Sequence, residues 1–234
     1  MQAQAEYKKV GFYYMKRKNL FWGLGLLAGF LLWTLLVSYV DVQPIGPLGS
    51  RVGFAWINRF VHDLTGVHWW LYTLTDWLSL IPLGFAAGFG LQGLAQWITR
   101  KHLRLVDRSL WLLGGFYGVV LGVFLLFETL VINYRPVLVE GVLEASYPSS
   151  TTMLVLCVML TARMHIRHTA PKWCNHLIGI FTVCMVIGRL VSGVHWVTDI
   201  IGGILLSGGL VKIYGFVLDA VAGASPRPTF VVEN

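Results

Sequence analysis

Long apolar segments bounded by basic residues limit how this chain can fold more than any other feature. Apolar runs cover approximately residues 20–40, 78–98, 109–132, 149–166, 174–191 and 196–218. As a helix, a run of roughly 20 residues crosses the hydrocarbon core of a membrane. The charged fraction of 12% and the mean hydropathy of +0.67 lie outside the range of soluble domains. The sequence therefore predicts an all-α integral membrane bundle of six transmembrane helices, with residues 1–234 forming a single membrane-embedded domain.

Lysine and arginine are distributed unevenly among the connections. They concentrate in the N-terminal segment and in the loops at 99–108 and 163–172, and one more lies in the tail. Because cytoplasmic loops carry an excess of these residues, we expect both termini in the cytoplasm and a multi-pass protein of the plasma membrane. The segments 1–19 and 219–234 are expected to be polar tails, the second without fixed structure. The run at 20–40 is too long for a signal-peptide core, and no small-residue cleavage site follows it.

The connection at 41–67 carries apolar residues at helical spacing. Phe54, Trp56, Phe60 and Leu64 fall on one stripe, which is typical of an amphipathic helix lying in the membrane interface between spans 1 and 2. A helix packed over the bundle explains the pattern equally well. In the span that follows, Pro82 is expected to cause a kink.

Cysteine and charge content exclude several classes of protein. The three cysteines form no close pair and no metal-ligand spacing, so we expect neither disulfides nor a zinc site. The net charge of +7 arises at the ends of apolar segments, where it sets orientation, so no nucleic-acid partner is expected. The chain lacks a glycine-rich nucleotide loop followed by Lys-Ser/Thr, which argues against an ATP-driven machine. No cofactor and no metal are expected.

The stretch 188–199 holds three ionisable residues in apolar surroundings. His195 and Asp199 are four residues apart, so on a helix the carboxylate can hold one imidazole nitrogen and free the other. A turn at Ser192-Gly193 would bring Arg189 to the same point. A neutral histidine backed by a carboxylate and faced by a guanidinium suits attack on a phosphoryl group.

Each of these residues also has a simpler interpretation. Arg189 can snorkel toward the membrane surface, His195 can be an interfacial anchor, and Asp199 can pair with a neighbour. The three together favour a functional site, because ionisable groups at membrane depth are costly.

Two further stretches contain groups that could bind phosphate. Residues 147–152 read Tyr-Pro-Ser-Ser-Thr-Thr just before an apolar run, a pattern that starts helices and could cradle a phosphate or simply cap the helix. Residues 133–136 read Asn-Tyr-Arg-Pro, and one arginine beside a proline is a weak signal alone.

Taken together, the three stretches resemble the membrane-bound type 2 phosphatidic acid phosphatases. The signature of this family is Lys-x6-Arg-Pro, then Pro-Ser-Gly-His, then Ser-Arg-x5-His-x3-Asp. Residues that match it are Arg135-Pro136, Pro148-Ser149, Arg189, His195 and Asp199. The resemblance implies that His195 is the nucleophile of a phosphohistidine intermediate and that Asp199 orients it. Arg135 and Arg189 would bind phosphate, together with the region of Ser149, Ser150 and Thr151.

The chain departs from the family pattern at four positions. Glu128 stands where the family has the lysine, and Ser150 stands where it has the glycine. Thr151 replaces the histidine of the second motif, and Gly188 replaces the serine of the third. The resemblance makes the missing histidine the general acid that protonates the leaving oxygen. Glu128 would repel phosphate unless it is protonated or paired with Arg135, so we assign it a possible auxiliary role.

These observations predict a metal-independent hydrolase acting on a lipid phosphate at the extracytoplasmic face. The alternatives are a lipid-linked phosphotransferase that uses the same histidine and a non-catalytic binder or carrier of lipid phosphates. Because Thr151 cannot deliver a proton as imidazolium does, a diphosphate with its weakly basic leaving group should be preferred, and a polyprenyl diphosphate is the first candidate. The expected partners are this substrate and membrane lipids; the sequence leaves the oligomeric state open.

Overall fold

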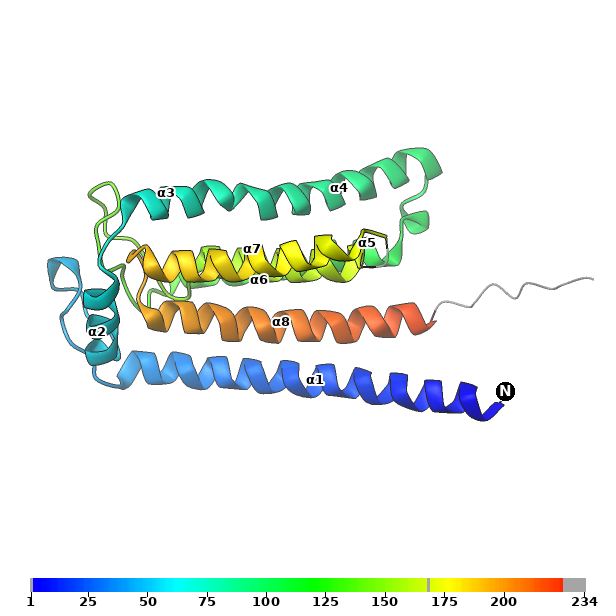
Figure 1. Ribbon diagram of the computed structural model, residues 1–234, viewed down its shortest axis with the longest axis horizontal. Helices are drawn as coiled ribbons and strands as arrows, with labels where there is room; N and C mark the ends of the chain where they lie inside the picture. Colours follow the sequence, from blue (N-terminus) through cyan, green and yellow to red (C-terminus); the bar gives the residue numbers. More distant parts are fainter. Residues whose placement is uncertain (1, 168, 225–234) are drawn as a thin grey trace, which may run out of the picture.

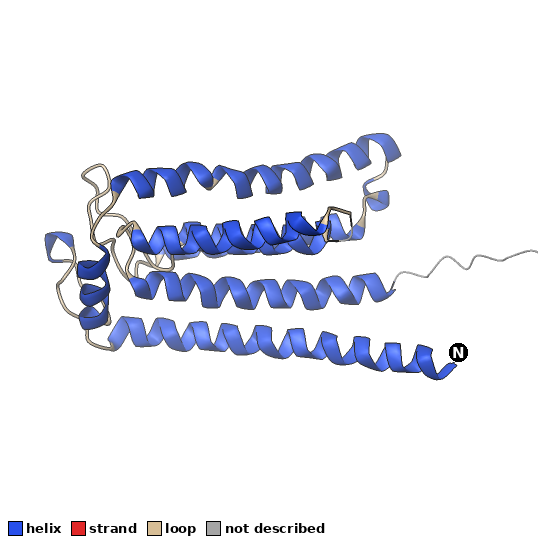
Figure 2. Cartoon of the chain, viewed as in Figure 1, coloured by secondary structure: helices blue, strands red, loops and turns tan. Residues whose placement is uncertain are grey.

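The fold is a bundle of near-parallel helices with one short helix across its end (Figure 1). The computed structural model describes residues 2–167 and 169–224. The helices in this part are α1 (Gln2–Tyr39), α2 (Ala55–Thr65), α3 (Trp69–Leu78), α4 (Leu80–Arg100), α5 (Arg108–Thr129), α6 (Ser150–Ile166), α7 (Lys172–Val191) and α8 (Val197–Ala224), with 3-10 turns at Pro47–Gly49 and Leu103–Leu105. The described residues form no extended strands, and the remainder is loop (Figure 2).

Five segments are long and apolar enough to cross a membrane, and α6 is a shorter apolar helix. The chain is therefore an all-helical, multi-pass membrane protein. At 17 residues, α6 spans about 25 Å. It lies in the middle of the bundle, where it packs against α4, α5, α7 and α8. Two apolar clusters surround it, one shared with α1, α5 and α8 and one with α7.

The second span differs from the sequence prediction. The helical segment begins at Trp69 rather than near Leu78, and it is interrupted at Ser79 between α3 and α4. Pro82 explains the interruption, since it has no N–H to donate to the carbonyl of Leu78. Ser79 itself keeps helical dihedral angles, φ −68° and ψ −14°, so α3 and α4 together form one candidate span, Trp69–Arg100.

The tails also differ from the prediction. Helix α1 already begins at Gln2, so residues 2–19 continue the first span as helix. Helix α8 continues to Ala224, well past the predicted end of the last span. Residues 225–234 of the predicted tail lie outside the described part of the chain.

Helix α2 lies across the end of the bundle and is fastened to it by one buried side chain (Figure 1). The Asn58 amide donates to the carbonyl of Gly53 at 2.7 Å and to Oγ1 of Thr198 at 3.0 Å, and its oxygen accepts from the Thr198 N–H at 3.3 Å. Trp56, Phe60 and Leu64 are exposed. The helix therefore packs over α8 and also turns an apolar stripe outward.

We expect Asn58→Ala to lower the thermal unfolding midpoint of the detergent-purified protein. It leaves buried backbone groups of Gly53 and Thr198 without partners, which costs roughly 1–3 kcal/mol, or several degrees for a chain of this size. Arg59→Ala, at the exposed neighbouring position, is the matched control. Equal midpoints for the two variants would contradict the fastening role of Asn58.

Candidate active site

His195 lies in the turn between α7 and α8. Gly193 adopts a φ of 71°, and a Cβ at this position would lie 1.9 Å from the carbonyl oxygen of Gly66. Only glycine fits both conditions. The chain turns at Ser192-Gly193 as the sequence predicts, and Arg189 and His195 lie at the same end of the bundle.

The neighbours of His195 determine which ring nitrogen carries the proton. Nη1 of Arg135 lies 3.4 Å from Nε2 of His195, and Nδ1 lies 3.7 Å from Oδ2 of Asp199. A guanidinium can only donate, so Nε2 accepts and the neutral ring carries its proton on Nδ1, facing the carboxylate. The Nδ1 to Oδ2 distance is longer than a hydrogen bond, so Asp199 faces the ring without binding it directly.

The charge of His195 follows from its surroundings. The side chain is buried, and it lies in the turn outside the spans. Burial and then the cations of Arg135 and Arg189 hold the pKa of His195 well below its usual range. The imidazole is therefore neutral at pH 7, the state in which Nε2 has a free electron pair.

Asp199 connects three segments of the chain. Oδ1 accepts from the side-chain amide of Asn133 at 3.3 Å, and Oδ2 accepts from the N–H of Trp196 at 3.0 Å. The backbone carbonyl of Asp199 accepts from the N–H of Ser149 at 3.1 Å. These bonds bring the loop after α5, the turn before α8 and the start of α6 to one point.

A small hairpin presents Arg135. Residues 134 and 145 pair across it, and Glu140-Gly141 turn with positive φ at both positions, as two-residue hairpins prefer. Glu144 thereby lies opposite Arg135, with its carboxylate 2.9 Å from Nε. The indole N–H of Trp196 donates to the carbonyl of residue 134 at 2.7 Å, which fixes the hairpin against the His195 turn.

Helix α3 holds Arg189. The guanidinium carbon lies 4.8 Å from the centre of the Tyr72 ring, and Nη1 donates to Oγ1 of Thr75 at 3.3 Å. Oδ1 of Asp76 is 4.0 Å from Nη1. A Cβ on Gly188 would lie 2.9 Å from Thr75, so the glycine in place of the family serine lets α3 approach α7 closely. Nε of Arg189 is buried without a partner among the described residues.

The start of α6 faces the same region. Ser149 is buried and caps the helix, because its hydroxyl accepts from the N–H of Thr152. Ser150 is half-buried and Thr151 is buried. Glu128, at the end of α5, shares a small hollow with Ser150. The partner of Arg135 is therefore Glu144 and not Glu128.

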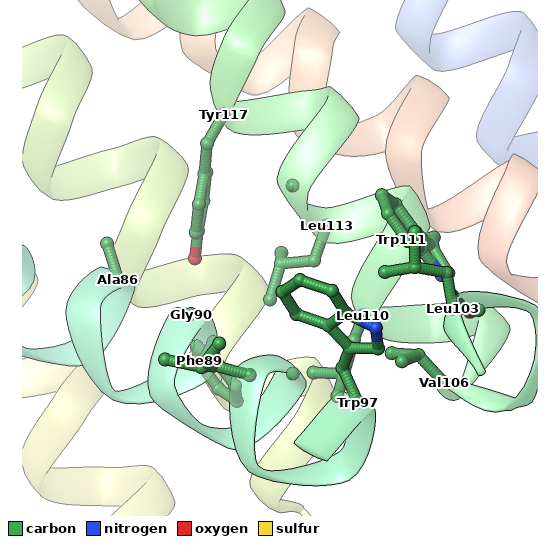
Figure 3. Close-up of a pocket in the computed structure, with 13 residues that line it drawn as sticks. Ala86, Phe89, Gly90, Trp97, Leu103, Val106, Leu110, Trp111, Leu113 and Tyr117 are labelled. Atoms are coloured by element: carbon green, nitrogen blue, oxygen red, sulfur yellow. Dashed lines mark hydrogen bonds between the residues drawn. The ribbon is translucent and has the colours of Figure 1, made fainter. Parts of the chain in front are cut away.

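A groove leads from Thr151 along the membrane-spanning part of the bundle. A cavity of about 420 Å³ between α4, α5 and α6 is lined by Ser150, Thr151 and apolar side chains. A second cavity of about 400 Å³ continues between α4 and α5 and shares Ala86 and Tyr117 with the first (Figure 3). Trp97 and Trp111 line its far end. The groove is mostly apolar, with hydroxyl groups at the start of α6 and at Tyr117.

Several residues of the site were missed from the sequence. Tyr72, Thr75 and Glu144 stand outside the stretches that the sequence singles out, and Asn133 stands inside one of them but was given no role. Asp76 could have been found, because it is the only carboxylate in the apolar run from 69 to 98, and charges at such positions usually have a role.

Metal ligands and disulfides were not expected. Cys157, Cys174 and Cys184 are free. Within residues 2–167 and 169–224, no group of three His, Cys, Asp or Glu side chains could hold a metal ion.

Comparison with known proteins gives a matching family model and a similar solved fold. Residues 128–220 match the family model of the PAP2 superfamily, and this segment contains all the candidate residues named from the sequence. The fold is similar to the crystal structure of the first transmembrane PAP2 type phosphatidylglycerolphosphate phosphatase from Bacillus subtilis. The TM-score is 0.61 at 18% identity, over 88% of this chain and 98% of the other. None of the curated proteins compared with the chain matches it. Within residues 128–220 the chain is thus similar to the PAP2 superfamily.

Proposed function

We propose that the chain hydrolyses a lipid phosphate, and preferentially a lipid diphosphate, through a phosphohistidine on His195. The observation that carries this proposal is the environment of one atom. Nε2 of His195 is unprotonated, faces the guanidinium of Arg135 and belongs to a ring whose other nitrogen faces Asp199. Histidine in this setting is a nucleophile placed beside a phosphate ligand.

In the first step, Nε2 attacks the phosphorus atom and the bond from phosphorus to the leaving oxygen breaks. The ring becomes a cation, which the Asp199 carboxylate stabilises from the Nδ1 side. Arg135 and Arg189 bind the non-bridging oxygens, and Nε of Arg189 has donor capacity for this role. In the second step, water attacks the phosphorus, inorganic phosphate leaves and His195 returns to its neutral form.

Arg135 must move for the substrate to reach His195. Its Nη1 lies against the nucleophilic nitrogen, and both side chains are buried. A phosphoryl group can replace Nε2 of His195 as the partner of the guanidinium, since the charge-assisted bond to phosphate is stronger than the bond to a neutral imidazole. During this movement, Nε of Arg135 can keep its contact with the exposed Glu144 carboxylate.

The groove between α4 and α5 supports a substrate with a long hydrocarbon chain. One end is lined by Ser150 and Thr151, and the rest is mostly apolar over two adjoining cavities. A chain lying there would leave its phosphate at the start of α6, where free N–H groups and the helix dipole favour an anion.

The residue at position 151 favours a diphosphate. A lipid monophosphate leaves as a basic alkoxide and needs a general acid, whereas a diphosphate leaves as a lipid phosphate with a final pKa of about 6. Thr151 can donate a hydrogen bond to the leaving group but cannot supply a proton. A polyprenyl diphosphate is the first candidate.

The distribution of charge supports an extracytoplasmic site and two cytoplasmic termini. The basic residues at 100–108 and 163–172 lie at the opposite end of the bundle from His195 (Figure 1). By the positive-inside rule, that end would face the cytoplasm. Six passes, with α3 and α4 together as the second, are consistent with both termini on that side.

Substituting His195 by Ala or Gln should lower the rate of phosphate release from lipid phosphates by about 10⁴-fold or more, because the nucleophile is lost. Asp199→Asn should lower the rate of phosphate release less than the His195 substitutions do, but still severely. Release of inorganic phosphate by detergent-purified protein measures both, with thermal unfolding to check folding. His102→Ala, at the other end of the bundle, is the control. A His195→Ala protein with substantial activity would rule out the covalent mechanism.

The substrate preference can be measured as kcat/KM on lipid diphosphates and monophosphates of matched chains. The diphosphate should be faster, because a general acid contributes about 10²–10⁴-fold only where the leaving group is basic. Thr151→His should raise activity on monophosphates. Equal values for the two substrates would defeat the argument. If a protonated Glu128 acts as the acid instead, Glu128→Gln will lose activity on both.

Orientation can be tested with single cysteines in a cysteine-free background. Val142 is exposed on the Arg135 hairpin, and His102 is exposed in the basic loop. An impermeant maleimide added outside intact cells should label Val142→Cys and leave His102→Cys unlabelled. The reverse pattern would put the candidate site in the cytoplasm and change the available substrates.

A further inference from the structure

We infer that a basic cavity at the end of the bundle opposite His195 binds the headgroup of an anionic phospholipid. The cavity measures about 560 Å³ and lies where α6 ends and α7 begins, with α1 and α8 at its sides. The inference depends neither on the proposed reaction nor on which end faces the cytoplasm, and the cavity shares no residue with the candidate active site.

The charges around the cavity have one sign. Arg163 and Arg167 come from α6 and the residue after it, Lys172 from the first turn of α7 and Lys212 from α8. The described lining contains no Asp or Glu. Among ion pairs between described residues, none involves Arg163, Lys172 or Lys212. Arg163, Lys172 and Lys212 thus bring cations from three helices to the cavity, and none of the three is ion-paired with another described residue.

The start of α7 adds to the attraction for an anion. The helix begins at Lys172 after Pro171, and no side chain caps it. Its first N–H groups and the positive end of its dipole therefore face the same place as the cations. Helix α7 is 20 residues long, so its N-terminal end carries the partial positive charge of a helix macrodipole.

The floor of the cavity distinguishes a lipid from a soluble anion. Leu26, Leu160, Met164 and Val211 line it, and Gly208 leaves room beside α1. A cavity with a cationic rim and an apolar floor matches a molecule with an anionic headgroup and a hydrocarbon chain. Basic pockets between transmembrane helices bind lipid headgroups in this way.

The depth of Lys212 gives a second reason for a lipid. Its side chain is exposed, and it lies about 13 Å before Val221, where the last span ends, at 1.5 Å per residue. An ammonium group at that depth is costly in hydrocarbon unless it reaches water or an anion. A phosphate drawn between Lys212 and Lys172 would offset this cost.

The test measures lipid binding to the full-length protein in neutral detergent by native mass spectrometry. The probes are dioleoyl phosphatidylglycerol, dioleoyl phosphatidylcholine and inorganic phosphate. Lys172→Gln/Lys212→Gln is compared with Lys101→Gln/Arg104→Gln, which removes equal charge from the neighbouring loop outside the cavity. Because anionic lipid also has affinity for the candidate active site, only the difference between the two double variants is assigned to the cavity.

Phosphatidylglycerol should bind the unaltered protein more tightly than phosphatidylcholine. The Lys172→Gln/Lys212→Gln protein should lose about 25-fold in affinity, at about fivefold for each cation removed, and the loop variant should lose little. If the cavity variant does not fold, Lys212→Gln alone should show the fivefold loss. Equal losses in both double variants, or no preference between the lipids, would overturn the inference. Competition by inorganic phosphate at equal concentration would show a site for soluble anions instead.

Discussion

The burial of the Asp199 carboxylate governs how this end of the protein is built. The side chain is fully buried, and an ionised carboxylate in that position is costly unless its oxygens accept hydrogen bonds. Its donors come from Asn133 and from the backbone of Trp196, and its own carbonyl is bonded by Ser149. The loop after α5 and the turn before α8 therefore converge on this carboxylate, and the start of α6 is bonded to the backbone of the same residue.

Local features of this end could be predicted from the sequence, and the partners across the bundle could not. The turn at Ser192-Gly193, the spacing of His195 from Asp199 and the Ser149 cap depend on residues at most four positions apart. The partner of Asn58 is 140 residues away, and the partner of Thr75 is 114 residues away. A buried asparagine or threonine has the same appearance in sequence as an exposed one, so only the packing of α2 and α3 reveals these contacts.

The carboxylates near Arg135 show the same limit. Sequence spacing draws attention to Glu128, which stands at a position of the family motif. The structure pairs Arg135 with Glu144 instead, because the turn at Glu140-Gly141 folds the chain back on itself. Glu128 remains at the exposed end of α5 beside Ser150. Cross-strand pairs are set by turn geometry, which distances along the sequence do not encode.

Charge balance gives a physical reason why a phosphate suits this region. Arg135 and Arg189 are both buried, and Asp199 is the buried carboxylate at this end of the bundle. The other two acids, Glu144 and Asp76, are 41% and 61% exposed, so water screens their part in the balance. The buried groups therefore carry an excess of positive charge, and His195 avoids adding to it by staying neutral. A phosphoryl group brings negative charge to the same place, which lowers the cost of keeping two guanidinium groups away from water.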